Sequence, residues 1–296
     1  MSTPIVILYN PQAGLASSQD ELHRAITAMK SQGTPIRLLS LPRDKPWRVQ
    51  IESLLEDGMG TFIAAGGDGT VNAIASCLLD TGCRLGIIPT GTMNHVARQL
   101  KIPLDMTAAL EIIRQGRSEL IDVAEVNDLP FLNFSSIGVY ADSLMTRTEQ
   151  QRLGWNQRLA LFRSMLTIAR FYKPLQLHFL KESQEVNVET PLFLISNNPL
   201  NIANATILSD QDQFQSSILH VAYLPSNGWV AQLRLGFSIL FDKPIETALT
   251  PTGLSSFDIA SQQECLSVSL DGDIRLMHPP LRYTSRPRAQ CHFSQN

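Results

Sequence analysis

Apolar runs alternate with polar, glycine-bearing segments through the first 116 residues of the chain. Residues 5–9 are continuously apolar, which is typical of a strand buried on both of its faces. Similar runs predict three further strands, at residues 36–41, 61–65 and 84–88. Apolar residues at helical spacing predict helices between them, at residues 18–32, 47–57, 71–79 and 107–115. This alternation predicts a doubly wound α/β domain with a parallel sheet and helices on both faces.

The pattern changes near residue 118 to short strand-like segments separated by turn signals. The expected strands are residues 120–126, 131–136, 175–180, 186–196, 218–224 and 265–270, with a hairpin signal at 127–130. Helical patterns interrupt them only at about 142–172 and 229–241. We therefore expect an α/β domain over 1–122 and a mainly antiparallel domain over 123–279. The sequence leaves open whether the tail, about 280–296, returns to the first domain.

Composition and charge exclude several classes of protein. The 296 residues carry 24 Lys and Arg against 27 Asp and Glu, a net charge of −3, which argues against a nucleic-acid partner bound through a general basic surface. The four cysteines lack the spacing of a metal or redox motif. The start of the chain reads as a strand rather than a secretory signal, and the apolar stretch 229–241 is too short to span a bilayer. These features predict a cytoplasmic protein.

The segment TFIAAGGDGTVN, residues 61–72, places three glycines and an aspartate between a predicted strand and a helix. Backbone N–H groups in such a turn, together with the helix N-terminus, favour a bound phosphate. The chain has no Gly-Lys pair for a Walker motif, and Asn72 stands where the dinucleotide fingerprint needs a third glycine. A tight turn without a ligand is the alternative, but it leaves Asp68 unexplained, since a carboxylate there repels phosphate unless a cation intervenes.

Two more polar turns follow predicted strands, at residues 10–14 and 89–94. The carboxyl ends of the strands in a doubly wound sheet lie on one edge, where ligands bind. The three turns are therefore expected to converge at one site.

These turns resemble those of the diacylglycerol kinase catalytic-domain family, which includes bacterial lipid kinases and sphingosine kinases and is related to NAD kinases. The matching motifs are Asn10-Pro11-x-x-Gly14, Gly66-Gly67-Asp68-Gly69-Thr70 with Asn72, Gly91-Thr92-x-Asn94, and the stretches 121–123, 131–133, 136–138 and 270–273. They follow the family's order over nearly the whole chain. The resemblance implies a β-sandwich-like second domain, with ATP bound in a cleft between the two domains.

The resemblance also implies roles for individual residues. Asp68 would organise Mg²⁺ with help from Asp122. The residues expected to bind the nucleotide are Asn10, Pro11, Gly14, Ser40, Gly66, Gly67, Asp68, Gly69, Thr70, Val71, Asn72, Thr92 and Asn94, of which Ser40 rests on a loose alignment.

A pair of carboxylates, Asp271 and Asp273, is the candidate for handling the acceptor's proton, together with Asp68 as a catalytic residue. In CLSVSLDGD, residues 265–273, apolar and polar positions alternate, so an extended strand continuing past Gly272 would put both acids on one face. The family has Asp-Gly-Glu here, and Asp273 is a shorter second acid. A plain hairpin turn at Asp-Gly is the alternative.

Two departures from the family pattern are the evidence for an alternative, a catalytically impaired nucleotide- or lipid-binding protein, whereas the retained Asp68, Asp122 and Asp271 favour a kinase. His95 stands where the family has aspartate, and residues 216–220, SSILH, lack the acids of an accessory Mg²⁺ site. An NAD-kinase-like enzyme, which shares the GGDGT turn, is the less favoured alternative.

The remaining expectations concern the acceptor and partners. The resemblance implies an ATP-dependent lipid kinase acting on a diacylglycerol-like hydroxyl, with a monomer and a homodimer both open. Residues 147–173 combine six basic side chains with one acid and many apolar ones, a composition suited either to the inner membrane surface or to ordinary domain packing.

Overall fold

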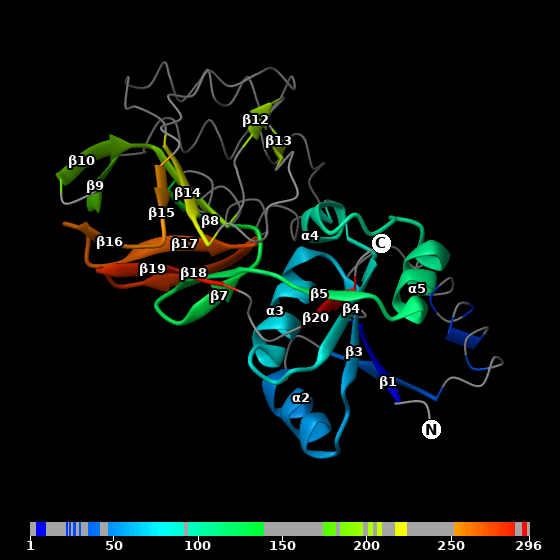
Figure 1. Cartoon of the computed structure of the whole chain (residues 1–296). Coiled ribbons are helices and arrows are strands. Elements are labelled where there is room, and N and C mark those ends of the chain that lie inside the picture. Colours follow the sequence, from blue (N-terminus) through cyan, green and yellow to red (C-terminus); the bar gives the residue numbers. More distant parts are fainter. Residues whose placement is uncertain are drawn as a thin grey trace, which may run out of the picture. The chain divides into compact units, whose positions relative to one another are not determined.

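The structure is a computed structural model in which the chain forms two compact units, residues 1–122 with 287–296 (unit 1) and residues 123–286 (unit 2). It describes residues 4–9, 22, 24, 26–27, 30, 35–41, 47–91, 94–138, 174–181, 184–197, 201–203, 206–208, 217–223, 252–287 and 292–294. Figure 1 shows the chain with most of its helices and strands labelled.

Unit 1 is built on one six-stranded sheet in the order β2-β1-β3-β4-β20-β5 (Figure 1). Its strands are β1 (Ile5–Tyr9), β2 (Ile36–Ser40), β3 (Thr61–Gly66), β4 (Arg84–Pro89), β5 (Ser118–Leu120) and β20 (His292–Ser294). All pairs are parallel except β20 with β5, the antiparallel pair at one edge. The predicted parallel α/β fold is confirmed, and the strand bounds agree with the apolar runs to within one residue for the first four strands.

Helices cover the sheet of unit 1. They are α2 (Trp47–Glu56), α3 (Asp68–Leu78), α4 (His95–Gln99) and α5 (Met106–Gln115). Ile7 and Ile63 of the sheet pack with Leu110 and Ile113 of α5 in one core cluster. A side chain on Gly86 of β4 would lie 2.8 Å from Ile113, so glycine is what lets α5 pack this closely. Helix α3 begins three residues before the predicted start, inside the glycine turn, so Asp68 and Gly69 are its first two residues.

Unit 2 consists of two six-stranded sheets, here called sheet B and sheet C. Sheet B has the order β10-β9-β16-β19-β6-β7, with β6 (Val123–Val126), β7 (Leu129–Phe131), β9 (Leu175–Lys181), β10 (Gln184–Thr190), β16 (Ser256–Ser261) and β19 (Leu281–Arg286). Sheet C has the order β15-β14-β11-β8-β17-β18, with β8 (Phe134–Gly138), β11 (Leu192–Ser196), β14 (Leu219–Tyr223), β15 (Thr252–Leu254), β17 (Leu266–Leu270) and β18 (Asp273–Met277). A separate two-stranded sheet joins β12 (Asn201–Ala203) and β13 (Thr206–Leu208).

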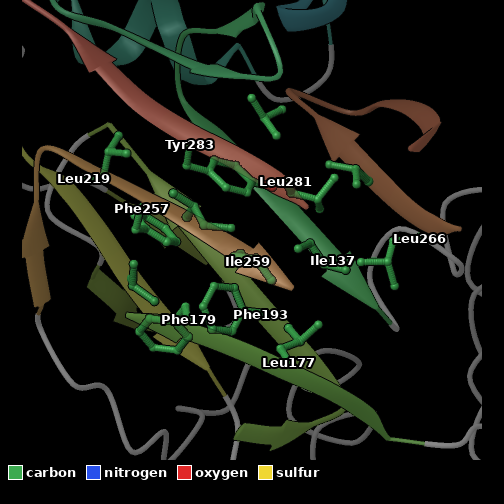
Figure 2. Packing of buried hydrophobic residues seen from close by; sticks show 14 of the residues in the cluster. Ile137, Leu177, Phe179, Phe193, Leu219, Phe257, Ile259, Leu266, Leu281 and Tyr283 are labelled. Carbon is green, nitrogen blue, oxygen red and sulfur yellow. The ribbon is translucent and has the colours of Figure 1, made fainter. Parts of the chain in front are cut away.

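The core of unit 2 lies between sheets B and C. Figure 2 shows aromatic and aliphatic side chains from both sheets meeting there, among them Phe257 and Tyr283, whose rings stack with centroids 5.4 Å apart. The hydroxyls of Tyr283 in sheet B and Ser135 in sheet C lie 3.0 Å apart. Burial raises the pKa of the Tyr283 hydroxyl, so this bond joins two neutral groups. The mainly antiparallel second domain is therefore confirmed.

Two strands predicted in unit 2 are each divided in the structure. The predicted strand 120–126 is split at residues 121–122 into β5 of unit 1 and β6 of unit 2. The predicted strand 186–196 is split at Pro191, so that β10 lies in sheet B and β11 in sheet C. Apolar patterning does not mark these crossings because the chain stays buried through them. The helices expected at 142–172 and 229–241, and the basic segment 147–173, lie outside the described residues.

Among the described residues, no helix is both long enough and apolar enough to cross a membrane.

Candidate functional site

The carboxyl ends of β1, β2, β3 and β4 lie on one edge of the unit 1 sheet. Strand β1 pairs with β2 on one side and with β3 on the other, so the chain reverses its winding direction between β1 and β3. Ligands of open α/β sheets bind at such a switch point. The glycine turn after β3 and the exposed Ser40 at the end of β2 both lie on this edge. Four predicted nucleotide contacts lie outside the described residues: Asn10, Pro11, Gly14 and Thr92.

Two glycines of the candidate site, Gly67 and Gly91, lie in contact with each other. A side chain on Gly91 would place its Cβ 2.4 Å from Gly67 Cα, so the turn after β3 and the turn after β4 touch backbone to backbone. A Cβ on Gly66 would lie 2.4 Å from the side chain of Thr70. Around Gly69, by contrast, there is open space within 4 Å of a Cβ. Packing therefore explains Gly66, Gly67 and Gly91, and it does not explain Gly69.

The side chains of Asn94 and Asp68 hold the turn after β3 and the turn after β4 together. Asn94, in the left-handed conformation before α4, accepts the Gly91 N–H through Oδ1 (3.0 Å) and donates from Nδ2 to the Gly91 carbonyl (2.8 Å). Asp68, the first residue of α3, accepts the Val96 N–H through Oδ1 at 3.0 Å. Asp68 thus joins the start of α3 to the start of α4, which gives the aspartate of the turn a structural task beside any metal.

The start of α3 has backbone groups suited to an anion. The N–H groups of Thr70 and Val71 donate to the Gly67 carbonyl, so the Asp68 and Gly69 N–H groups precede the first bonds of the helix. Gly67 supplies no side-chain cap. The side chains of Thr70, Val71 and Asn72 are buried. Of this predicted phosphate turn, the backbone at residues 68–69 is therefore the part suited to meeting a ligand.

His95 is held neutral beside Asp68. Burial lowers the pKa of the His95 imidazole most strongly; the Asp68 carboxylate opposes this, and the Arg98 guanidinium adds to the lowering. A neutral imidazole can donate or accept a hydrogen bond, but it cannot reproduce the charge of the aspartate that the family pattern has at this position.

The carboxylate of Asp122 is 2% exposed and follows β5 in unit 1. In the part of the chain that the structure describes, no three His, Cys, Asp or Glu side chains cluster as a protein-only metal site would require. Mg²⁺ in phosphoryl-transfer sites takes one or two carboxylates and completes its shell with phosphate and water oxygens. Asp68, which is partly exposed, suits such a ligand, and its role with Asp122 stays a prediction.

The predicted pairing of Asp271 and Asp273 on one extended face is wrong. Asp271 and Gly272 have φ angles of 47° and 89° and form the two-residue turn between β17 and β18, in which Leu270 pairs with Asp273. Positive φ at both positions is the hairpin geometry that Asp-Gly favours. The turn places Asp271 inside, 6% exposed, and leaves the Asp273 side chain 57% exposed.

The Asp271 carboxylate binds three successive backbone N–H groups. Oδ2 accepts from Leu132 (2.7 Å), and Oδ1 accepts from Asn133 and Phe134 (3.0 Å each). Residues 132–134 carry the chain from β7 in sheet B to β8 in sheet C, and the Asp271 N–H donates back to the Phe134 carbonyl (3.0 Å). Consecutive N–H groups of this kind form an anion-binding concavity, which here is filled by a side chain of the same protein. We call this arrangement the Asp271 clamp.

Asp273 makes an exposed ion pair with Arg275, with Arg275 Nη2 and Nε at 3.0 and 3.2 Å from Oδ2. Its carboxylate is therefore reachable from solvent.

Several residues that build these arrangements leave no recognisable pattern in the sequence. The Val96 N–H and the N–H groups of residues 132–134 act through the backbone, so their side chains carry no signature. The segment proposed to have lost an accessory metal site runs from Ser217, at φ 53°, to His220 in β14; Ser216 lies outside the described residues.

Comparisons with known proteins agree with this fold. A profile of the diacylglycerol kinase catalytic domain matches residues 4–126. Diacylglycerol kinases of two Staphylococcus aureus strains, RF122 / ET3-1 and MRSA252, are each 31% identical over 134 residues, 45% of this chain. The match spans 42% of the length of these relatives.

Two crystal structures from Bacillus anthracis str. Sterne share the fold over the whole chain. One, of a diacylglycerol kinase, is 22% identical, has a TM-score of 0.72 and covers 99% of this chain and 97% of its own. The other is 19% identical with a TM-score of 0.75, and covers 99% and 98%. The resemblance to the diacylglycerol kinase catalytic-domain family is thereby confirmed over residues 4–126, and both units share their fold with these solved structures.

Proposed function

We infer that this chain, which carries a diacylglycerol kinase catalytic domain at residues 4–126, is a lipid kinase that transfers the γ-phosphoryl group of ATP to a hydroxyl of a diacylglycerol-like membrane lipid. Kinase chemistry of this kind depends on neutralising charge and on holding the phosphates in place, with little covalent work for the protein.

The observation that carries this proposal is the pair of glycine turns held together by Asp68 and Asn94. Gly69 has open space beside it, and the N–H groups of residues 68–69 are available at the start of an eleven-residue helix. A turn built only for packing needs Gly66, Gly67 and Gly91 but not Gly69. A phosphate that meets the backbone at this position explains Gly69.

Mg²⁺ and ATP suit the residues that are present. Asp68 has one oxygen bound by the Val96 N–H, and a carboxylate at this place would hold Mg²⁺ together with Asp122. When bound, the metal would neutralise the charge that develops on the transferred phosphoryl group. The backbone at 68–69 would orient the phosphates, and Ser40 at the end of β2 and Asn94 before α4 are the further residues proposed to contact the nucleotide.

The acceptor hydroxyl needs a group that takes or orients its proton. Asp273 is the exposed carboxylate of the predicted pair, whereas the oxygens of Asp271 are engaged by three backbone donors. We therefore assign Asp273 to the acceptor proton and Asp271 to holding the turn in which Asp273 begins the next strand.

The test is phosphorylation of a bacterial lipid extract with γ-labelled ATP and Mg²⁺, followed by recovery of label in the organic phase. Asp68→Asn keeps an oxygen for the Val96 N–H, so the fold should be retained while lipid labelling falls by at least 100-fold, the scale on which one electrostatic group acts in catalysis. Asp273→Asn should also lower labelling. Asp258→Asn is its matched control, since Asp258 is a similarly exposed acid paired with Arg282, and labelling should be unchanged.

A nucleotide- or lipid-binding protein without turnover is the second candidate, and the neutral His95 favours it. If the wild-type protein binds ATP but labels none of diacylglycerol, phosphatidylglycerol or a sphingoid base, this second candidate replaces the kinase proposal. Labelling of NAD in place of lipid would favour the NAD-kinase-like alternative.

A further inference from the structure

The chain crosses between the two units twice, and both crossings join the same two pairs of strands. In unit 1, β5 pairs with β20, and in unit 2, β6 pairs with β19, both antiparallel. The chain passes from β5 to β6 through residues 121–122 and returns from β19 to β20 through residues 287–291. The two connections therefore start side by side in unit 2 and end side by side in unit 1. We call these four strands and the two connections the ribbon.

The strand pairing of the ribbon stops directly at the connections. The last pair in unit 2 is Val123 with Arg286, and the last pair in unit 1 is Leu120 with His292. Ladder hydrogen bonds fix the backbone up to these residues, so a rotation of one unit against the other has to be absorbed in the connections. Hinges in proteins are a few residues of this kind, at the ends of regular elements.

The core of unit 2 gives the last pair of the ribbon little support. The inward-facing residues nearest the connections are Ala124 and Ser285, which lie opposite each other. Ala124 is small, and the hydroxyl of Ser285 is buried without a hydrogen-bond partner. Two residues earlier in β19, the ring of Tyr283 is packed in the core (Figure 2). Burial of apolar surface therefore stabilises this end of the ribbon less than it stabilises the middle of β19.

An ion pair on the other face of sheet B joins the two strands at this end. Arg286 Nη1 donates to Glu125 Oε1 at 2.7 Å, from the last residue of β19 to the third residue of β6. The two side chains are 35% and 15% exposed, against 74% and 50% for the Arg282–Asp258 pair on the same sheet. Charges that are partly withdrawn from water are screened less, so the Glu125–Arg286 pair is the stronger of the two.

We propose that Glu125 and Arg286 are positioning residues, whose ion pair keeps the last strand pair of the ribbon closed and thereby limits rotation of unit 2 against unit 1. This inference rests on the proposed lipid kinase function, which assigns Asp68 of unit 1 and Asp273 of unit 2 to one reaction. A misplacement of about 1 Å can cost about 100-fold in rate, so a ribbon that opens far from the chemistry still slows it.

Ordinary stabilisation of unit 2 is the alternative role for this pair. An ion pair that only stabilises sheet B would lower Tm when broken, and it would leave the distance between the units unchanged. The Asp258–Arg282 pair has this simpler role: it joins β16 to β19 and lies away from the connections. Asp258→Asn is therefore the matched control.

The experiment measures the distribution of distances between the two units, without ATP or lipid. Spin labels are attached through Val49→Cys in α2 and Ala260→Cys in β16, both exposed positions, in a chain whose native cysteines are replaced by alanine. We expect a broader distribution in Glu125→Gln and in Arg286→Gln. The double variant should be no broader than Arg286→Gln alone, because the two charges act as one pair. Arg286→Lys keeps the charge and should restore most of the narrow distribution, and Asp258→Asn should leave it unchanged.

Lipid phosphorylation supplies the second measurement. In Glu125→Gln and Arg286→Gln, kcat should fall about twofold to tenfold, the effect of one hydrogen bond on an equilibrium. The dissociation constant of ATP, measured by calorimetry, should not change, because all the residues proposed to contact the nucleotide belong to unit 1. In Asp258→Asn both quantities should equal those of wild type.

Three results overturn the proposal: an unchanged distance distribution in both glutamine variants, a broadening that is additive in the double variant, or a broadening that leaves the kcat of an active enzyme unchanged. A fall in Tm with unchanged distances assigns the pair to ordinary stabilisation. If wild type phosphorylates no lipid, the proposed function fails, and the distance distributions then decide the inference by themselves. Broadening in the glutamine variants that Arg286→Lys reverses supports it, and equal distributions in all the variants refute it.

Discussion

The clearest prediction concerns Asp271→Asn, which removes one charge from the Asp271 clamp without changing its size. In the native protein each oxygen of Asp271 accepts from the backbone, one from Leu132 and the other from Asn133 and Phe134. In the variant, the amide oxygen can occupy only one of these places. The amide nitrogen then faces a backbone N–H, and two donors oppose each other in a buried site.

The expected loss of stability follows from these three bonds. Hydrogen bonds to a charged group contribute about 1.5–3 kcal/mol and neutral ones about 0.5–1.5 kcal/mol. Two bonds that become neutral lose about 1 kcal/mol each, and the third is lost altogether, which gives a total of about 4 kcal/mol. Because domains are typically stable by about 5–15 kcal/mol, the variant should fold but be much weaker.

The assay is urea unfolding of the full chain together with hydrogen exchange at the amides of residues 132–134, which should exchange faster in the variant. Asp273→Asn is the control, since an exposed ion pair with Arg275 contributes about 0–1 kcal/mol. A loss below about 1 kcal/mol in Asp271→Asn, together with loss of activity, would refute the clamp and return Asp271 to the role of a base.

Three further predictions test other parts of the structure. Gly91→Ala should lower Tm, with an overpacking cost of about 1–3 kcal/mol, because the new Cβ would lie 2.4 Å from Gly67 Cα. Gly69→Ala has open space around the new Cβ, so it should keep or raise Tm while weakening nucleotide binding measured by calorimetry. Burial lowers the pKa of His220, so the unfolded state binds its proton first as the pH falls below about 6.5, and the free energy of unfolding should drop more steeply toward pH 5 in wild type than in His220→Gln. Asp105→Ala removes the side-chain cap of α5 and should cost about 1 kcal/mol in urea unfolding, and an unchanged midpoint would contradict the cap.

Much of unit 1 could be predicted from the sequence because its signals are local. The strand β1 is a run of apolar residues, and α5 is bounded by the Asp105 cap and by Gly116 in the left-handed conformation. Unit 2 was predicted less well, because the chain is buried at Thr190 and Pro191, where it passes from β10 to β11, so these two strands look continuous in the sequence. Pro191 is the local sign of that crossing.

The candidate site, too, could be predicted where its signals are local and not where they depend on distant parts of the chain. The turns at Gly67 and Gly91 could be recognised from their composition. Their contact with each other could not be predicted, because it depends on the order of the strands in the sheet. The roles of Asp271 and Asp273 could not be separated from the pattern, because the positive φ angles at Asp271 and Gly272 reverse the chain between them. The donors to Asp271 are backbone groups about 138 residues away, beyond the reach of any local pattern.

The strand β20 has a consequence for how the protein is made. Residues 292–294 lie between β4 and β5, so the sheet of unit 1 includes strands from both sides of the whole of unit 2. During synthesis on the ribosome, every strand of unit 2 emerges before β20, and pairings between distant segments form slowly. Unit 2 is therefore expected to reach its native state first. Until β20 is made, β4 and β5 have unpaired backbone edges that a chaperone would have to protect from pairing with other chains.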